Sequence, residues 1–569
     1  MKKIIYFITI IFALVLSSCG TNETSPREAI GGKVYGGEFR FMSAEKVENL
    51  FTVSSIDIYS QRLNSQIFES LVKLDIESFK VVPSIAASYE VSSNAKSFTF
   101  KIRRGIRFHD DDCFGGEGRE LTAADVKFSL ELACSGLKMN NMSYLLVDRI
   151  EGGRDFFNRT RKNLSKEGVS GIQVLDKQTI QINLNEPFIG FDKILSHTNL
   201  GIFPKEAYDM YGAELGKHPV GTGPFMLEKM DKEGVILKRN PHYWRKDEFG
   251  NQLPFLDKIS MTYVKDKKSE LLAFRKREID LVLEIPVEEI DNILGSLKEA
   301  QAGKNVKHRV ESKSSMSMNY VAFAYESAEF RDINVRRALN KAIDKKIIVN
   351  QQLMGEGWAA ENGFVPVMPN YHNETVVGHK YEVEEARALL AAAGYPNGKG
   401  FPKLDFYVNS IEGSSNHKMC QGIAQQLKEN LNIDLNIKLC SYEQRNKAIA
   451  NGTAKIWRSG WIADYPDAES FLSLFYSKNI KQDGGEVNAF KFVDSNYDQL
   501  FEIAMKELDE AKRNELFALC DQIIIDKAPV VPMLTDDFMA MVNARVRDFK
   551  TNSMEALDFS SIFIKEPKK

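Results

Sequence analysis

Strict alternation of apolar and polar residues marks two segments in the first half of the chain. Residues 98–102 (Phe-Thr-Phe-Lys-Ile) and 180–184 (Ile-Gln-Ile-Asn-Leu) place an apolar side chain at every second position. This period of two predicts half-buried strands. Between them, Thr122 and Asp125 have the spacing of a capping box, which predicts the start of a helix with Val126 and Leu130 on one face.

The second half is more regular, because predicted helices and strands follow one another in turn. A helix over 382–393 stops at Gly394, as a C-cap followed closely by a proline should. This rhythm is typical of an α/β lobe with a partly parallel sheet, so the predicted fold class is α/β. The other elements predicted here are a helix over 415–430, a strand over 433–439, a helix over 443–451, a strand leading into Trp457, and a strand from residue 530.

The N-terminus has the features of a bacterial lipoprotein signal. Two lysines precede the apolar run 4–16, which is shorter than the roughly 20 residues that span a bilayer. Residues 16–19 (Leu-Ser-Ser-Cys) match a lipobox. We expect residues 1–18 to be removed and Cys19 to carry the lipid that tethers the protein to the periplasmic or outward face of a bacterial membrane. Residues 19–34 then form a flexible leash. The alternative is an ordinary secretory signal with an incidental cysteine.

Length and charge narrow the class of protein. A chain of 569 residues is too long for one hydrophobic core and predicts two or three domains. The net charge of −3 becomes −5 once residues 1–18, which hold two lysines and no acid, are removed. This mild acidity argues against nucleic acid as a partner.

Cysteine and histidine usage does not indicate a metal site, a cofactor or a catalytic nucleophile. The sequence has no H-E-x-x-H, C-x-x-C or G-x-S-x-G motif, so we predict no metal, no cofactor and no enzyme. The run from His109 to Cys113 is interpreted as a surface hairpin. We expect mostly buried free thiols, with disulfide bonding left open, at Cys113, Cys134, Cys420, Cys440 and Cys520.

Several short motifs occur in a fixed order along nearly all of the mature chain. They are residues 68–71 (FESL) with 82–86 (VPSIA), 98–110 (FTFKIRRGIRFHD) with 121–126 (LTAADV), 221–225 (GTGPF) with 239–244 (RNPHYW), and 335–344 (VRRALNKAID). Each motif is modest alone, but the ordered set is specific. The chain resembles the family-five extracellular solute-binding proteins, which are the oligopeptide, dipeptide and nickel receptors of ABC importers.

The resemblance implies a two-lobed, periplasmic-binding-protein-like α/β fold, in which a hinge closes the lobes on a ligand. On that model, lobe I is discontinuous and combines residues 35–58, 187–312 and 531–569. An additional domain is inserted at 59–186, and lobe II covers 313–530.

The segment after the strand at Trp457 supplies the candidate ligand-binding residues. In a dehydrated cleft, Asp464 can pair with the amine of a peptide, and Arg458 can clamp a carboxylate through two hydrogen bonds. The resemblance implies the same roles, because peptide-binding relatives use the Asp of a "GW-x-A-D-Y" pattern for the amine and a nearby Arg for carboxylates. The alternative is that Asp464 caps the helix after Pro466 and Arg458 is a solvated strand residue.

Four further residues complete the predicted site. Gly460 would let a ligand backbone approach closely, so that the strand extends onto the ligand. Trp461 and Tyr465 are expected to wall the cleft. Asp57 is added by the resemblance alone, from a family stretch that touches ligand.

These observations predict a lipid-anchored, monomeric, non-enzymatic receptor. It would capture peptides and deliver them to an ABC permease and its ATPase. The alternatives are a receptor for a nickel chelate or another small solute, a cell-surface lipoprotein hydrolase, and a receptor-fold scaffold or sensor that no longer binds a ligand.

Overall fold

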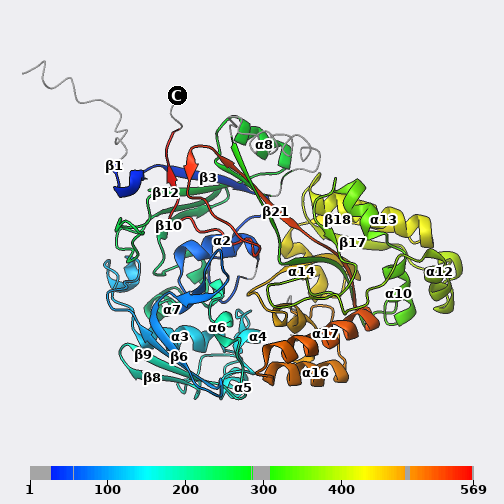
Figure 1. Cartoon of the computed structure of the whole chain (residues 1–569), viewed down its shortest axis with the longest axis horizontal. Coiled ribbons are helices and arrows are strands. Elements are labelled where there is room, and N and C mark those ends of the chain that lie inside the picture. Colours follow the sequence, from blue (N-terminus) through cyan, green and yellow to red (C-terminus); the bar gives the residue numbers. More distant parts are fainter. Residues whose placement is uncertain (1–26, 56, 284, 286–307, 481–486, 567–569) are drawn as a thin grey trace, which may run out of the picture.

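The computed structural model describes residues 27–566 except for residues 56, 284, 286–307 and 481–486 (Figure 1). The predicted signal, the lipobox and Cys19 therefore lie outside the described residues. Within the described part, none of the helices combines the length and the apolar character needed to cross a membrane.

The first lobe is built on a seven-stranded mixed sheet with the order β10-β11-β12-β3-β13-β21-β14. Helices α2 (Ile58–Ile67) and α8 (Lys267–Arg275) belong to this lobe, and α2 contacts β10. The strands are β3 (Glu38–Ser43), β10 (Phe225–Asp231), β11 (Gly234–Arg239), β12 (Lys258–Tyr263), β13 (Leu281–Leu283), β14 (His308–Ser314) and β21 (Asp537–Asn543).

The second lobe is built on a six-stranded sheet with the order β16-β20-β15-β19-β17-β18. Strand β17 runs parallel to both β18 and β19, which confirms the predicted α/β character. The strands are β15 (Ser317–Phe323), β16 (Trp358–Ala359), β17 (Leu404–Asn409), β18 (Leu435–Cys440), β19 (Ile456–Ile462) and β20 (Val530–Thr535). The main helices are α10 (Ile333–Lys341), α12 (Val383–Ala392), α13 (Ser415–Leu431), α14 (Tyr442–Ala450), α16 (Ser495–Lys506) and α17 (Glu510–Lys527).

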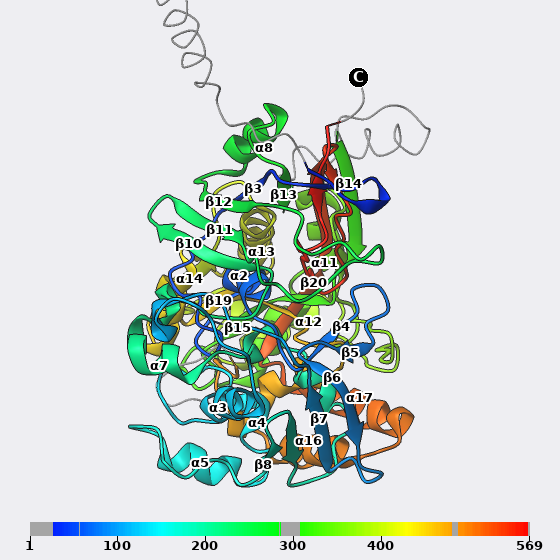
Figure 2. The ribbon, with the colours of Figure 1, turned by 90° about the vertical axis from the view of Figure 1, so that its left-hand side faces the viewer.

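A third layer lies below the sheet of the first lobe in both views (Figures 1 and 2). It is a four-stranded antiparallel sheet of β6 (Ala86–Val91), β7 (Ser97–Ile102), β9 (Thr179–Asn183) and β8 (Ile172–Asp176), in that order. The predicted capping box at Thr122 is present and opens α3 (Ala123–Ala133). Helices α4 (Ser143–Leu146) and α5 (Gly153–Arg159) follow.

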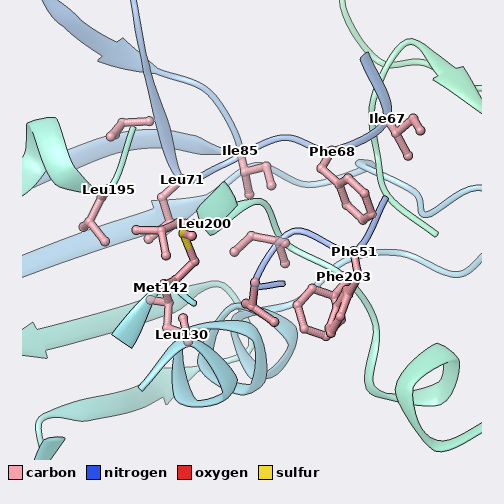
Figure 3. Packing of buried hydrophobic residues seen from close by; sticks show 14 of the residues in the cluster. Phe51, Ile67, Phe68, Leu71, Ile85, Leu130, Met142, Leu195, Leu200 and Phe203 are labelled. Carbon is pink, nitrogen blue, oxygen red and sulfur yellow. The ribbon is translucent and has the colours of Figure 1, made fainter. Parts of the chain in front are cut away.

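The third layer and the first lobe share one hydrophobic core. Phe51 and Phe68 come from segments of the first lobe and belong to the same buried cluster as Leu130 of α3 and Met142 (Figure 3). Phe203 packs edge-on against Phe51, with ring centroids 4.9 Å apart. Because a shared core resists relative motion, we treat this layer as moving with the first lobe.

The smaller elements connect these layers. The short helices are α6 (Phe191–Ile194), α7 (Lys205–Tyr211), α11 (Lys345–Ile347) and α15 (Glu469–Leu472). The short strands are β1 (Arg27–Glu28), β2 (Val34–Tyr35), β4 (Val72–Leu74), β5 (Val81–Pro83), β22 (Val546–Arg547) and β23 (Phe563–Ile564).

The chain crosses between the lobes at two places. It passes from β14 to β15 through residues 315–316, and from β20 to β21 through Asp536. Residues 531–535, which the sequence assigned to lobe I, pair with β15 in the sheet of the second lobe instead. Residues 59–67, assigned to the additional domain, belong to α2 on the first lobe. The pairing of β20 with β15 sets the first boundary. The contact of α2 with β10 sets the second.

Two predictions about single residues have different outcomes. The five cysteines described are free thiols, and Cys134, Cys420 and Cys520 are buried, as predicted. The run from His109 to Cys113 lies in a hairpin, with antiparallel bridges between Arg107 and Glu120 and between Asp111 and Gly116, as predicted, but the His109 side chain is buried and not at the surface. One ring nitrogen lies 3.0 Å from the Gly223 carbonyl oxygen, and the other accepts the Gly221 N–H at 3.2 Å.

Arg336 provides a test of this packing. Its buried guanidinium donates to the Phe330 carbonyl, which precedes α10, and to the Lys527 carbonyl at the end of α17. Removing the donors leaves these carbonyls unpaired, so Arg336→Met should lower the free energy of unfolding by about 3 kcal/mol. Its neighbour Arg337 donates at the surface to the Asp526 carbonyl, and Arg337→Met should cost under about 1 kcal/mol. Denaturant unfolding compares them, and equal losses would contradict this account.

Candidate functional site

A cavity of about 880 Å³ lies between the two lobes. The first lobe contributes α2, including Tyr59 and Arg62, and the second lobe contributes β15 and β19. A cavity of this size is typical of ligand-binding sites, and many of the side chains that line this one are charged or polar.

Strand β19 presents an open edge to this region. It pairs with β15 along its whole length, from Ile456 to Ile462. On its other side, the ladder with β17 ends at Trp457. Among the described strands, none continues this pairing beside residues 458–462. Backbone groups on such an edge can hydrogen-bond an extended ligand.

Arg458 brings a half-buried positive charge into the cavity. Its guanidinium donates to Asn319 Oδ1, and its Nε is buried without a partner. Burial lowers the pKa of Arg458, while the nearby Asp536 opposes that effect. No carboxylate oxygen of a described residue lies within 4.0 Å of the guanidinium. A half-buried Arg without a direct counter-ion is suited to an anionic group of a ligand.

Gly460 makes room for that guanidinium. A Cβ atom at residue 460 would lie 3.0 Å from a terminal nitrogen of Arg458 and 3.4 Å from Asn319 Oδ1. The absence of a side chain at residue 460 therefore avoids a clash with the Arg458 guanidinium and keeps this part of the strand accessible to a ligand.

The Asp464 carboxylate lines the cavity and accepts two hydrogen bonds from outside its own lobe. Tyr144 donates its hydroxyl at 2.8 Å, and His197 Nε2 lies 3.1 Å away. The Asp464 side chain is 10% exposed. The sequence-based alternative that Asp464 caps the following helix does not describe this structure, because the N-cap of α15 is Ala468.

The tautomer of His197 follows from its neighbours. Its Nδ1 accepts the backbone N–H of Asn199 at 3.0 Å, so the proton of a neutral ring is on Nε2, which donates to Asp464. Both partners of Asp464 are therefore neutral donors. The carboxylate keeps its negative charge available for a cation.

The two aromatic residues of the segment lie in different places. Trp461 lines the cavity, and its indole N–H donates to Ser470 Oγ at 3.4 Å. Tyr465, which the sequence placed in the cleft wall, is 1% exposed and packs in the core. Its hydroxyl donates to the buried Glu469 carboxylate, and this pairing holds the ring away from the cavity.

Asp57 lines the cavity as the N-cap of α2. Its carboxylate accepts the Ser60 N–H at 2.7 Å. Burial raises the pKa of Asp57, against the lowering effect of the hydrogen bond from Ser60. The capping contact gives this residue a structural role in addition to its place on the wall.

A network of buried charges joins the lobes beside the cavity. Arg149, from the segment after α4, forms an ion pair with Glu469 of the second lobe. Asp467 forms two ion pairs: its Oδ2 lies 3.2 Å from Lys193 Nζ, and it also contacts the Arg513 guanidinium. The Asp467 and Glu469 side chains are at most 2% exposed. This network lies on the loop that also carries Asp464.

Sequence reasoning missed several residues of the site. Tyr144, His197 and Asn319 belong to segments far from Asp464 in the chain, and no local pattern marks them. Arg445 of α14 is also buried and donates to Asn409 Oδ1 at 2.7 Å. Among the described residues, no cluster of three His, Cys, Asp or Glu is arranged to hold a metal ion.

Comparison with known proteins identifies relatives along most of the chain. The model of the family described as bacterial extracellular solute-binding proteins, family 5 Middle, matches residues 80–483. The chain is 27% identical over 495 residues to heme-binding protein A of Haemophilus influenzae, covering 85% of this chain and 84% of that protein. It is 26% identical over 511 residues to di/tripeptide-binding protein 1 of Pseudomonas aeruginosa, covering 88% of each.

Solved structures share the fold. The periplasmic binding protein DppA of Helicobacter pylori, in complex with the peptide STSA, has a TM-score of 0.80, 23% identity, and coverage of 94% of this chain and 99% of that chain. The murein tripeptide-binding protein MppA of Escherichia coli has a TM-score of 0.81, 19% identity, and coverage of 93% and 99%. These likenesses confirm the predicted two-lobed α/β fold.

The ion pair between Arg149 and Glu469 generates a prediction about stability. Arg149→Met should lower the free energy of unfolding by about 3–5 kcal/mol, because Glu469 would remain buried without its counter-ion. Arg154 pairs with Asp148 at the surface, so Arg154→Met should cost at most about 1 kcal/mol. Denaturant unfolding of the two variants measures the difference, and a loss below 1 kcal/mol for Arg149→Met would contradict a structural role of the pair.

Proposed function

Because the chain belongs to the bacterial extracellular solute-binding proteins of family 5, we propose that it captures short peptides between its lobes and delivers them to the permease and ATPase of an ABC importer. The supporting observation is the composition of one cavity: a carboxylate, a guanidinium without a direct counter-ion and an open strand edge. A peptide presents an amine, a carboxylate and a backbone that forms strand-like hydrogen bonds. Each group of the peptide therefore has a complement in the cavity.

In this proposal, Asp464 binds the peptide amine. Tyr144 and His197 orient its carboxylate without neutralising it. An ammonium group would add the positive charge that the carboxylate lacks, in a site from which water is largely excluded.

The peptide backbone lies along residues 458–462 of β19, with Trp461 as part of the wall. Arg458 binds a carboxylate of the peptide and gains an acceptor for its unpartnered Nε. Gly460 keeps the strand edge accessible. Main-chain hydrogen bonds of this kind provide affinity without strong dependence on side-chain identity.

Ligand binding and closure are coupled through Asp464. Its hydrogen-bond donors, Tyr144 and His197, lie on the opposite side of the cleft, so these bonds form only when the lobes meet. Contacts that exist only in the closed state shift the equilibrium toward it. We further propose that the receptor acts as a monomer tethered through a lipid on Cys19.

Replacing the charge of Asp464 tests the amine site. Asp464→Asn keeps the shape of the side chain but removes its charge, so peptide affinity should fall about 30- to 150-fold, or 2–3 kcal/mol. Isothermal titration calorimetry with a pool of di- to hexapeptides, on protein freed of co-purified ligand, measures this. Asp75→Asn is the control, since this carboxylate also lines the cavity but follows β4, in a different part of the chain from Asp464. Unchanged affinity in Asp464→Asn would exclude the proposed role of Asp464, and no binding by wild-type protein would exclude peptide capture.

A further inference from the structure

The cavity extends past β19 along the first lobe, where it meets four charged side chains. Lys73 lies on β4, Glu69 lies just before that strand, Arg245 follows β11, and Asp558 belongs to the C-terminal segment. All four line the same cavity as Arg458 and Asp464.

The two acids of this cluster are satisfied by neutral donors. Burial raises the pKa of Glu69, and its hydrogen bonds partly offset this effect. Asp558 accepts hydrogen bonds from the backbone and hydroxyl of Ser560. The donors to Glu69, at 2.9–3.1 Å, are the side chains of Thr222, Tyr243 and Trp244. Neither carboxylate forms an ion pair within 4.0 Å. The cations act on them over a longer distance: burial raises the pKa of Asp558, but the charges of Lys73 and Arg245 lower it, and the charge of Arg245 also opposes the effect of burial on Glu69.

The two cations have no direct counter-ion. No carboxylate oxygen of a described residue lies within 4.0 Å of the Lys73 ammonium or the Arg245 guanidinium. Burial lowers the pKa of Lys73, and the charge of Arg245 lowers it further. Other lysines at this end of the cavity are paired: Lys33 has three carboxylates at 3.1–3.4 Å, and Lys550 has one at 2.8 Å.

We propose that Lys73 and Arg245 form an anion subsite for a carboxylate of the bound peptide. The carboxylate is that of an acidic side chain or that of the C-terminus of a longer peptide. It would bring a carboxylate into direct contact with two half-buried cations that have none within 4.0 Å, through charge-assisted hydrogen bonds. The inference rests on the proposed capture of peptides and adds a preference for acidic ligands.

Matched peptides test the subsite by titration calorimetry. The probes are tetra-alanine, three variants with glutamate at position 2, 3 or 4, and their glutamine twins. We expect wild-type protein to bind at least one glutamate peptide tenfold or more tightly than its twin. In the variant with both Lys73→Gln and Arg245→Gln, this advantage should fall below threefold. If an acidic side chain occupies the subsite, this variant should keep the wild-type affinity for tetra-alanine. If the C-terminus occupies it, the affinity for tetra-alanine should fall about tenfold.

Two further variants control this comparison. Lys246 also lines the cavity but is exposed, so Lys246→Gln should keep the full glutamate advantage. Lys73→Gln alone should lose part of it, which keeps the test decisive if the double variant does not fold.

C-terminal amidation of tetra-alanine distinguishes the two sources of the carboxylate. If the C-terminus occupies the subsite, amidation should weaken binding tenfold in wild-type protein and not in the double variant. If an acidic side chain occupies it, the effect of amidation should disappear in Arg458→Gln instead.

Three results would overturn the proposal. The first is equal affinity for every glutamate peptide and its twin, together with an amidation effect that does not depend on Lys73 and Arg245. The second is a glutamate advantage that survives in the double variant. In both cases binding of tetra-alanine would leave peptide capture standing. The third is failure of all these peptides to bind, which would overturn the subsite and the proposed function together.

Discussion

The loop after β19 carries three carboxylates, those of Asp464, Asp467 and Glu469, that have little contact with water where the lobes meet. Each is compensated from across the interface: Asp464 by neutral donors, Asp467 by Lys193, and Glu469 by Arg149. An unpaired buried carboxylate would cost several kcal/mol, so the lobes can close only in the register that satisfies all three. This requirement fixes the position of β19, and with it the wall of the cavity.

The three carboxylates differ in the charge of their partners. Asp467 and Glu469 have cationic partners and so hold the interface whether or not a ligand is present. Asp464 has neutral partners only, and in the proposed function its charge binds the amine of the ligand. Asp464, Asp467 and Glu469 lie within six residues of one another. The contact between the lobes and the proposed ligand site therefore cannot move independently. The shared core below the first lobe keeps the opposing donors in place.

The elements of the fold follow from local patterns, and the site follows from them only in part. Alternation and capping signals located β7, β9, α3 and α12, because these depend on residues close in sequence. The segment around Asp464 and Arg458 was recognisable for the same reason. Tyr465 was misplaced because its orientation depends on the buried Glu469. The donors to Asp464 and the crossing at Asp536 depend on contacts between distant segments, which no local pattern records.

A crystal structure of the protein with a bound short peptide such as tri-alanine tests the central claim most directly. The account predicts the peptide amine within hydrogen-bond distance of the Asp464 carboxylate, with the peptide backbone beside residues 458–462. It also predicts that Tyr144 and His197 remain on the same carboxylate. A peptide bound with its amine away from Asp464, or bound outside the cavity between the lobes, would contradict the account.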